Sequence, residues 1–212
     1  MTTEQLGPFT LILPEGCFPL GEDSLALGGF APVRPGGKVC DLGCGGGTLL
    51  LLLARRESSL SLTGVEIDES AANAARENLA RNGLAGEIVT GDLNTRGLLP
   101  NEGFDLVISN PPWFPLDAGA SAGAARSEEA LTLDGLCAAA NRLLKTGGRF
   151  ALVYPPARLC DLFCALRAHK LEPKRLQFLA HGPDAPASAA LVEAVKNGGP
   201  GLEVLGQLMR NA

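Results

Sequence analysis

The sequence predicts an α/β fold with a doubly wound, mostly parallel sheet of seven strands and helices on both faces. From Lys38 onward, short branched-chain and apolar runs alternate with segments of helical pattern, which is typical of a parallel sheet. The last two runs are joined by a proline-rich loop without a helix, so we expect them to pair antiparallel. The expected strands cover residues 39–42, 62–67, 87–90, 104–109, 149–154, 174–179 and 189–195.

The N-terminal stretch, residues 1–35, is irregular in pattern. Residues 9–13 could form a short strand, and residues 23–30 could form a short helix that begins with a capping residue. A proline- and glycine-rich break follows at residues 32–37. Because this stretch is too short to fold alone, we expect it to pack as a lid or strap on a main domain of residues 36–212.

Four helices are expected between the strands of the main domain. The second has Ala72, Ala75 and Leu79 on one side and Gly83 as its C-terminal stop. A glycine pair at residues 147–148 ends the third, and a small edge strand is expected at residues 202–205. The four helices cover residues 48–56, 69–82, 131–144 and 157–170.

Composition excludes several classes of protein. The longest aliphatic run has six residues, 49–54, whereas a membrane-spanning helix needs about 20. The first residues show no export signal, so a cytoplasmic protein is expected. The six cysteines lack the spacing of zinc or thioredoxin-like motifs, so no metal site is expected. A net charge of −5 argues against a general polyanion binder, although residues 126–212 carry 11 basic against 8 acidic side chains.

Polar residues stand at the ends of four successive expected strands. Because ligands bind beyond the carboxyl ends of parallel strands, this edge of the sheet is the expected site. After the first strand, glycines 43, 45 and 47 would let the backbone approach a ligand closely, whereas Thr48 stands where a dinucleotide loop needs glycine. The four strand-end residues are Asp41, Glu66, Asp92 and Asn110.

Two of these acids suggest a nucleoside. Glu66 lies 25 residues beyond Asp41, where a carboxylate can accept hydrogen bonds from both hydroxyls of a ribose. Asp92 could accept an adenine amino proton. Simpler alternatives remain open: Glu66 as a solvated acid, and Asp92 as a helix cap or an Asx turn.

The fourth strand runs into Asn110-Pro111-Pro112-Trp113, where two prolines stop the strand. The Asn110 side-chain oxygen and the Pro111 carbonyl can each accept one hydrogen of a substrate amino group. Such bonds localise the nitrogen lone pair, aim it at a methyl donor and stabilise the positive charge that develops on nitrogen. Trp113 offers a face on which a flat substrate can stack. These four residues are the candidate catalytic residues.

These motifs, DLGCGGG, GVEID, GDL and NPPW, resemble those of class I S-adenosylmethionine-dependent methyltransferases with a Rossmann-like fold. The resemblance implies that Gly43, Gly45 and Gly47 line the methionine moiety of the cofactor, that Glu66 holds the ribose, and that Asp92 with Leu93 flanks the adenine. It also adds residues to the expected cofactor site, namely Asp23, Asp41, Ile67 and Asn110.

A closer resemblance covers nearly the whole chain. The segments FPLGEDSLALGGFAPVRPGGKVCDLG and GGRFALVYPPARLCDLFCALRAHKLEPKRLQFL are similar to the bacterial family that methylates the amino group of the adenine beside the anticodon of a valine tRNA. The resemblance implies a lid of residues 18–27 with Asp23 facing the cofactor pocket. It also implies a substrate loop after the catalytic motif, with Phe114 and Arg126 as substrate residues and Glu128 helping to shape the loop.

The sequence is therefore compatible with three functions. The first is methylation of an adenine amino group in a tRNA, the second is methylation of a protein glutamine amide, and the third is a non-catalytic module that binds the cofactor. The intact NPPW motif argues against the third.

Overall fold

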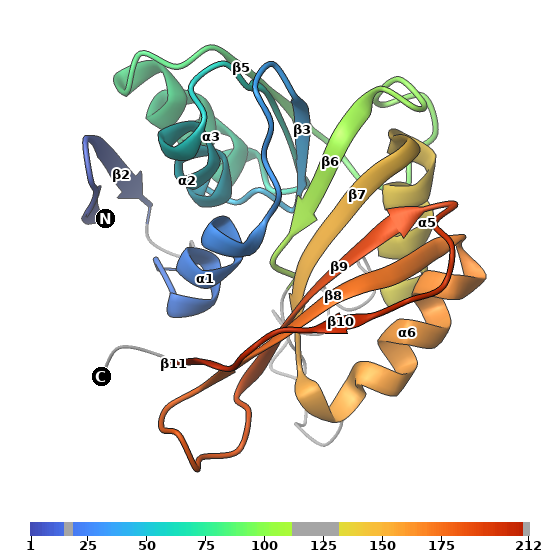
Figure 1. The fold of residues 1–212 in the computed structure, drawn as a ribbon. Coiled ribbons are helices and arrows are strands. Elements are labelled where there is room, and N and C mark those ends of the chain that lie inside the picture. The colour runs from blue at the N-terminus through green and yellow to red at the C-terminus, as the bar shows by residue number, and fades with distance from the viewer. Residues whose placement is uncertain (15–18, 112–131, 210–212) are drawn as a thin grey trace, which may run out of the picture.

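Residues 1–14, 19–111 and 132–209, the part of the chain that this computed structural model describes, form a nine-stranded sheet with helices on both faces, beside a small hairpin (Figure 1). The strands follow the order β10-β8-β9-β7-β6-β3-β4-β5, and β11 pairs with β8. Only β9 runs antiparallel to its neighbours in this sheet. The strands are β3 (Lys38–Leu42), β4 (Ser61–Glu66), β5 (Gly86–Thr90), β6 (Phe104–Ser109), β7 (Leu144–Tyr154), β8 (Leu171–Ala180), β9 (Ala189–Lys196), β10 (Glu203–Val204) and β11 (Leu208–Met209).

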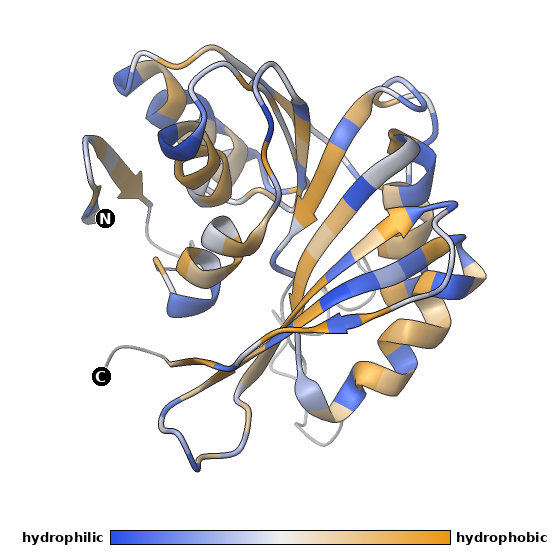
Figure 2. Ribbon diagram, in the orientation of Figure 1, coloured by the Kyte–Doolittle hydropathy of each residue, from blue (hydrophilic) through white to orange (hydrophobic). Residues whose placement is uncertain are grey.

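Different helices cover the two faces of the sheet. Because side chains alternate along each strand, neighbouring residues of one strand contact different sets of helices. In β6, Leu106 and Ile108 join one buried cluster with α1 (Glu22–Phe30), α2 (Thr48–Arg56) and α3 (Glu69–Arg81). Val107 points to the other cluster, with α5 (Leu133–Leu143) and α6 (Leu159–Ala168), which follows a short 3-10 turn, Pro156–Arg158. Figure 2 shows hydrophobic residues along most of β6. The predicted doubly wound, mostly parallel fold with a final antiparallel hairpin is confirmed.

The structure corrects the predicted elements in several places. Within the described residues the sheet has nine strands, because β11 joins the seven predicted strands and the predicted small edge strand, and α1 begins at Glu22 after Gly21 without a side-chain cap. A strand that the sequence did not indicate, β1 (Thr2–Leu6), pairs antiparallel with β2 (Phe9–Leu13). In addition, residues 145–148 are not a loop, because β7 begins at Leu144, directly after α5, and pairs there with Phe104 of β6. None of the helices in the described part of the chain is long and apolar enough to cross a membrane.

The N-terminal hairpin is fastened to α3 by two asparagines one helical turn apart. Asn78 accepts a hydrogen bond from the Ile12 amide (2.9 Å) and donates to the Ile12 carbonyl (2.8 Å). Asn82 makes the same pair of bonds with the Thr10 amide and carbonyl, both at 2.8 Å. These two side chains thus give hydrogen-bond partners to backbone groups of β2 on the edge that does not pair with β1.

The same contact reaches the glycine loop after β3. The Asn78 amide also donates to the Gly46 carbonyl at 2.9 Å. A Cβ atom at Gly46 would lie 2.4 Å from Leu13 Cδ2, so strand β2 lies directly against this loop. The hairpin therefore supports the loop from behind. The expectation that residues 1–35 act as a lid or strap stays a prediction.

Candidate active site

The four strand-end residues lie at one edge of the sheet. Strand β3 lies between β4 and β6, with Asp41 opposite Gly64 on one side and opposite Ile108 on the other. Glu66 ends β4 opposite Thr90 of β5, and the Gly91 amide donates to the Glu66 carbonyl. Asp92 follows β5, and Asn110 follows β6. The topology therefore brings together residues that are up to 69 positions apart in the sequence, the separation of Asp41 and Asn110.

The glycine loop leaves space in front of two of its residues. Gly43 and Gly45 have φ angles of 73° and 52°, which side chains rarely adopt, and a Cβ atom at either would meet no atom of the described residues within 4 Å. In contrast, Gly46 and Gly47 pack against Leu13 and Ala75. The loop therefore has a packed side and, with respect to the described residues, an open side that a ligand can approach.

Asp41 is a buried carboxylate that lacks a partner. Its side chain is 1% exposed, and neither of its oxygens has a hydrogen-bond partner within the described residues. Burial, and secondarily the charge of Glu66, raise its pKa well above the ordinary carboxyl range. A cationic or hydrogen-bonding ligand group at this edge would relieve that cost. The charged methionine end of S-adenosylmethionine, with its ammonium and sulfonium, fits this requirement.

Glu66 is held in place by the backbone. Its two carboxylate oxygens accept hydrogen bonds from the Gly45 amide (2.8 Å) and the Asp68 amide (3.0 Å). The neighbouring side chain, Ile67, is 57% exposed although it is apolar. A fixed acid next to an uncovered apolar side chain suits a ribose bound beside a flat base.

At the end of β5, Asp92 forms an Asx turn, one of the two simpler alternatives for this residue. Its Oδ1 accepts hydrogen bonds from the Asn94 amide (2.8 Å) and from Asn94 Nδ2 (2.9 Å). Its other oxygen has no hydrogen-bond partner among the described residues. Leu93 is 8% exposed and belongs to the core, and its carbonyl accepts from Arg142. The turn therefore fixes Asp92 and leaves one acceptor available to a ligand.

Asn110 is in contact with the N-terminal helix. Its Nδ2 donates to Ser24 Oγ at 3.0 Å, and Ser24 is 9% exposed. Asp23, the other acid expected here, is half-buried in the same first turn of α1. Pro111 is buried. Sequence reasoning missed Ser24 as a site residue, because its partner lies 86 positions away and only its place beside Asp23 pointed to it.

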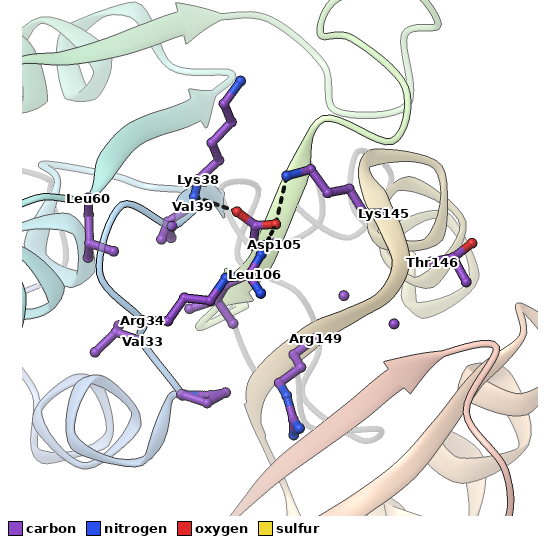
Figure 3. Close-up of a pocket in the computed structure, with 14 residues that line it drawn as sticks. Val33, Arg34, Lys38, Val39, Leu60, Asp105, Leu106, Lys145, Thr146 and Arg149 are labelled. Atoms are coloured by element: carbon purple, nitrogen blue, oxygen red, sulfur yellow. Dashed lines mark hydrogen bonds and ion pairs between the residues drawn. The ribbon is translucent and has the colours of Figure 1, made fainter.

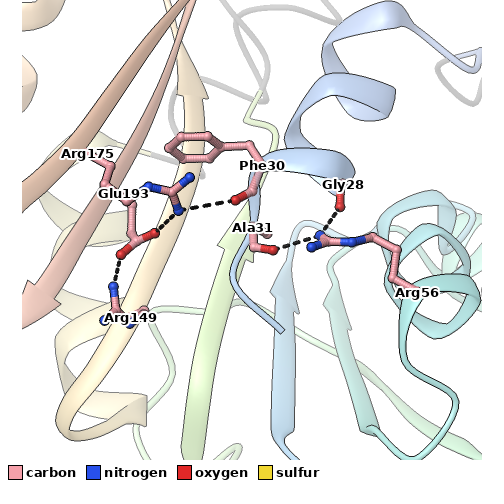
Figure 4. Close-up of polar contacts among 7 residues, drawn as sticks. All are labelled: Gly28, Phe30, Ala31, Arg56, Arg149, Arg175 and Glu193. Carbon is pink, nitrogen blue, oxygen red and sulfur yellow. Dashed lines mark hydrogen bonds and ion pairs between the residues drawn. The ribbon is translucent and has the colours of Figure 1, made fainter. Parts of the chain in front are cut away.

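The C-terminal end of α1 is fastened by two arginines (Figure 4). The Arg56 guanidinium donates to the carbonyls of Gly28 (2.5 Å) and Ala31 (2.7 Å). Arg175 donates to the Phe30 carbonyl at 3.4 Å and lies 4.5 Å from the centre of the Phe30 ring. Cations at a helix C-terminus stabilise its unsatisfied carbonyls. This clamp helps to fix the helix that holds Ser24.

Several expected site residues lie outside the described residues. They are Pro112 and Trp113 of the catalytic motif, Phe114 and Arg126 of the expected substrate loop, and Glu128.

Residues 25–160 match the methyltransferase small domain, a family of S-adenosylmethionine-dependent enzymes. A protein of Porphyromonas gingivalis described as tRNA1(Val) (adenine(37)-N6)-methyltransferase is 37% identical, over 74% of this chain and 66% of its own. A protein of the same description from Parabacteroides distasonis is 30% identical, over 89% of this chain and 81% of its own. The match thus spans just under two thirds of the Porphyromonas protein.

The solved structures agree on the fold. A crystal structure described as a predicted O-methyltransferase from Agrobacterium tumefaciens aligns with a TM-score of 0.73 at 22% identity, covering 88% of this chain and 86% of the other. At such identity the likeness supports the methyltransferase architecture and carries nothing about the substrate.

Proposed function

Because the chain belongs to the methyltransferase small domain family of S-adenosylmethionine-dependent enzymes, we propose that it methylates the N6 amino group of an adenine in the anticodon loop of a tRNA. One observation carries the proposal: the Asn110 amide is held by Ser24 at the end of β6, beside the open side of the glycine loop. An amide in that place serves an amino acceptor, because its oxygen can accept an N–H hydrogen.

Different residues of the described part of the chain would bind the cofactor and position the substrate. When bound, S-adenosylmethionine supplies an activated methyl group on its sulfonium. The cofactor would be held by the open side of the glycine loop together with Asp41, Glu66 and Asp92. Since Asn110 Nδ2 is engaged with Ser24, Oδ1 is the atom left to accept a substrate hydrogen.

The Asn110 Oδ1 atom and the Pro111 carbonyl oxygen can each accept a hydrogen bond from one hydrogen of the substrate amino group. This withdraws the nitrogen lone pair from the ring and aims it at the methyl group. The same two oxygens stabilise the positive charge that develops on nitrogen. A general base is not needed, since the product can lose its proton after transfer. Trp113, two residues after Pro111, offers a ring on which the base can stack. Stacking of this kind contributes about 1–3 kcal/mol to binding.

An unpaired loop adenine suits this arrangement, because it can be turned out of its stack at little cost. The names of the relatives support this choice of substrate and point to adenine 37 of a valine tRNA.

The test is to incubate the purified chain with methyl-labelled S-adenosylmethionine and either bulk tRNA or bulk cell protein, and to identify the labelled product. We expect N6-methyladenosine in digested tRNA. Label in protein glutamine would replace this proposal with amide methylation. Cofactor binding without transfer to either pool would leave only a cofactor-binding module.

A further inference from the structure

A pocket, shown in Figure 3, lies where strands of the sheet begin, whereas Asn110 follows the end of β6. It is found where β3, β6 and β7 begin, next to Lys38, Asp105 and Lys145, and its volume is about 210 Å³. Its apolar walls are formed by Pro32, Val33, Val39, Leu60 and Leu106. Nothing in the proposed methyl transfer uses this cavity.

Asp105 is the one acidic side chain among the residues that line this pocket, and two cations share it. Its Oδ1 accepts from both Arg34 Nη2 (2.5 Å) and Lys145 Nζ (2.7 Å), and its Oδ2 accepts from the Lys38 amide (2.9 Å). Burial alone would raise its pKa, but the bonds from Lys145 and the Lys38 amide and the charge of Arg34 outweigh burial and lower the pKa. The carboxylate therefore stays ionised and neutralises one of its two partners.

A second carboxylate at the same edge is shared in the same way. Glu193 of β9 is fully buried and forms ion pairs with Arg149, which lines the pocket, and with Arg175 at 2.6 Å (Figure 4). Neither arginine is fully neutralised, because one negative charge serves both.

The charges at this edge do not balance. Four cations, Arg34, Lys145, Arg149 and Arg175, face the two carboxylates, which leaves a surplus of two positive charges. Lys38 adds a third at the rim, where its side chain extends away from Asp105 in Figure 3 and forms no ion pair with the described residues. The whole chain carries −5, so this concentration of positive charge is not a general property of its surface.

We propose that this pocket binds a phosphate group. Its guanidinium and ammonium groups are the usual partners of phosphate, and a guanidinium can bind two oxygens at once. The cations can be reached, since the side chains of Arg34, Lys145 and Arg149 are 68%, 44% and 46% exposed. A water-sized sphere needs about 10–15 Å³ of such a volume, so a cavity of about 210 Å³ has room for a phosphate.

The phosphate could belong to an RNA backbone or to a small phosphorylated molecule. The site does not depend on the proposed methyl transfer, and it would explain how an acidic chain holds a polyanion.

The test titrates the full chain with inorganic phosphate and with pyrophosphate by calorimetry. We expect the double variant Arg34→Ala/Lys145→Ala to bind at least about tenfold more weakly, as expected for the loss of two charge-assisted contacts. Arg81→Ala, an exposed cation at the end of α3, is the matched control and should bind as the wild type does. Asp105→Asn removes the opposing charge, so it should bind phosphate more tightly. The melting temperature of each variant checks its folding.

The source of the phosphate is found with the same variants and bulk tRNA. If RNA is the source, log K for tRNA against log salt loses about one unit of slope for each phosphate contact removed by Arg34→Ala/Lys145→Ala. An unchanged slope, with phosphate binding still lost, assigns the site to a small molecule. The proposal is overturned if wild type binds neither phosphate nor pyrophosphate, or if the double variant and Asp105→Asn bind them as wild type does. Phosphate binding is measured without methyl transfer, so failure of the proposed function would not affect this result.

Discussion

Removing Asn78 should weaken both the fold and the cofactor site, whereas removing Asn82 should weaken the fold alone. Both side chains bond the backbone of β2, but only Asn78 also reaches the Gly46 carbonyl in the glycine loop. Asn78 is 1% exposed, and Asn78→Ala removes the partner of three backbone groups: the buried Gly46 carbonyl and the partly buried amide and carbonyl of Ile12. Each such group costs about 1 kcal/mol or more, so we expect a loss of about 3 kcal/mol.

For a chain of this length, 1 kcal/mol corresponds to a shift of about 2–4 °C in melting temperature. Asn78→Ala should therefore melt about 6–12 °C lower, while the more exposed Asn82→Ala loses about half as much. Differential scanning fluorimetry measures this shift. Calorimetric titration with S-adenosylhomocysteine should show about tenfold weaker binding for Asn78→Ala, equal to about 1.4 kcal/mol, and little change for Asn82→Ala. Equal losses of affinity in both variants would refute the role of the Gly46 contact.

Two further substitutions test the site itself. Burial and Glu66 raise the pKa of Asp41, and a carboxyl whose pKa is higher in the folded state destabilises the fold as pH rises from its unfolded toward its folded pKa. Asp41→Asn should therefore raise the melting temperature of the cofactor-free protein at about pH 8, change it little at about pH 4, and weaken cofactor binding; an equal shift at both pH values would contradict this. Ser24→Ala should lower kcat about tenfold, near the value of one hydrogen bond, with cofactor affinity unchanged, and Ser24→Thr should restore most of the rate. A kcat for Ser24→Ala equal to that of wild type would show that Asn110 needs no such partner.

The sequence was informative where local pattern and structure coincide. The buried strands and the glycine loop follow from runs of apolar residues and from glycines that adopt positive φ, so both were predictable. Strand β1 was not, because most of Thr2–Leu6 is exposed and the segment lacks alternation. It is a strand because β2 pairs with it and because Leu6 is buried against the helices.

Contacts between distant residues were beyond reach of the sequence. Three contacts join positions 66 to 86 apart in the sequence: Asn110–Ser24, Asn78–Ile12 and Arg34–Asp105. From the sequence alone, each polar side chain in these contacts could equally well lie on the surface. The two shared carboxylates likewise depend on which strands become neighbours. The strand-end acids were an exception, since parallel strands bring their carboxyl ends to one edge whatever the details of packing.

Transfer by the variant Asn110→Ala tests the central claim most directly. It should be assayed with methyl-labelled S-adenosylmethionine and bulk tRNA beside wild type, with cofactor affinity measured on the same preparations. We expect N6-methyladenosine to be lost almost completely, while the cofactor Kd stays within about tenfold, near 1.4 kcal/mol. Transfer at the wild-type rate by this variant would contradict the account, because the amino group would then be held by something other than the Asn110 amide.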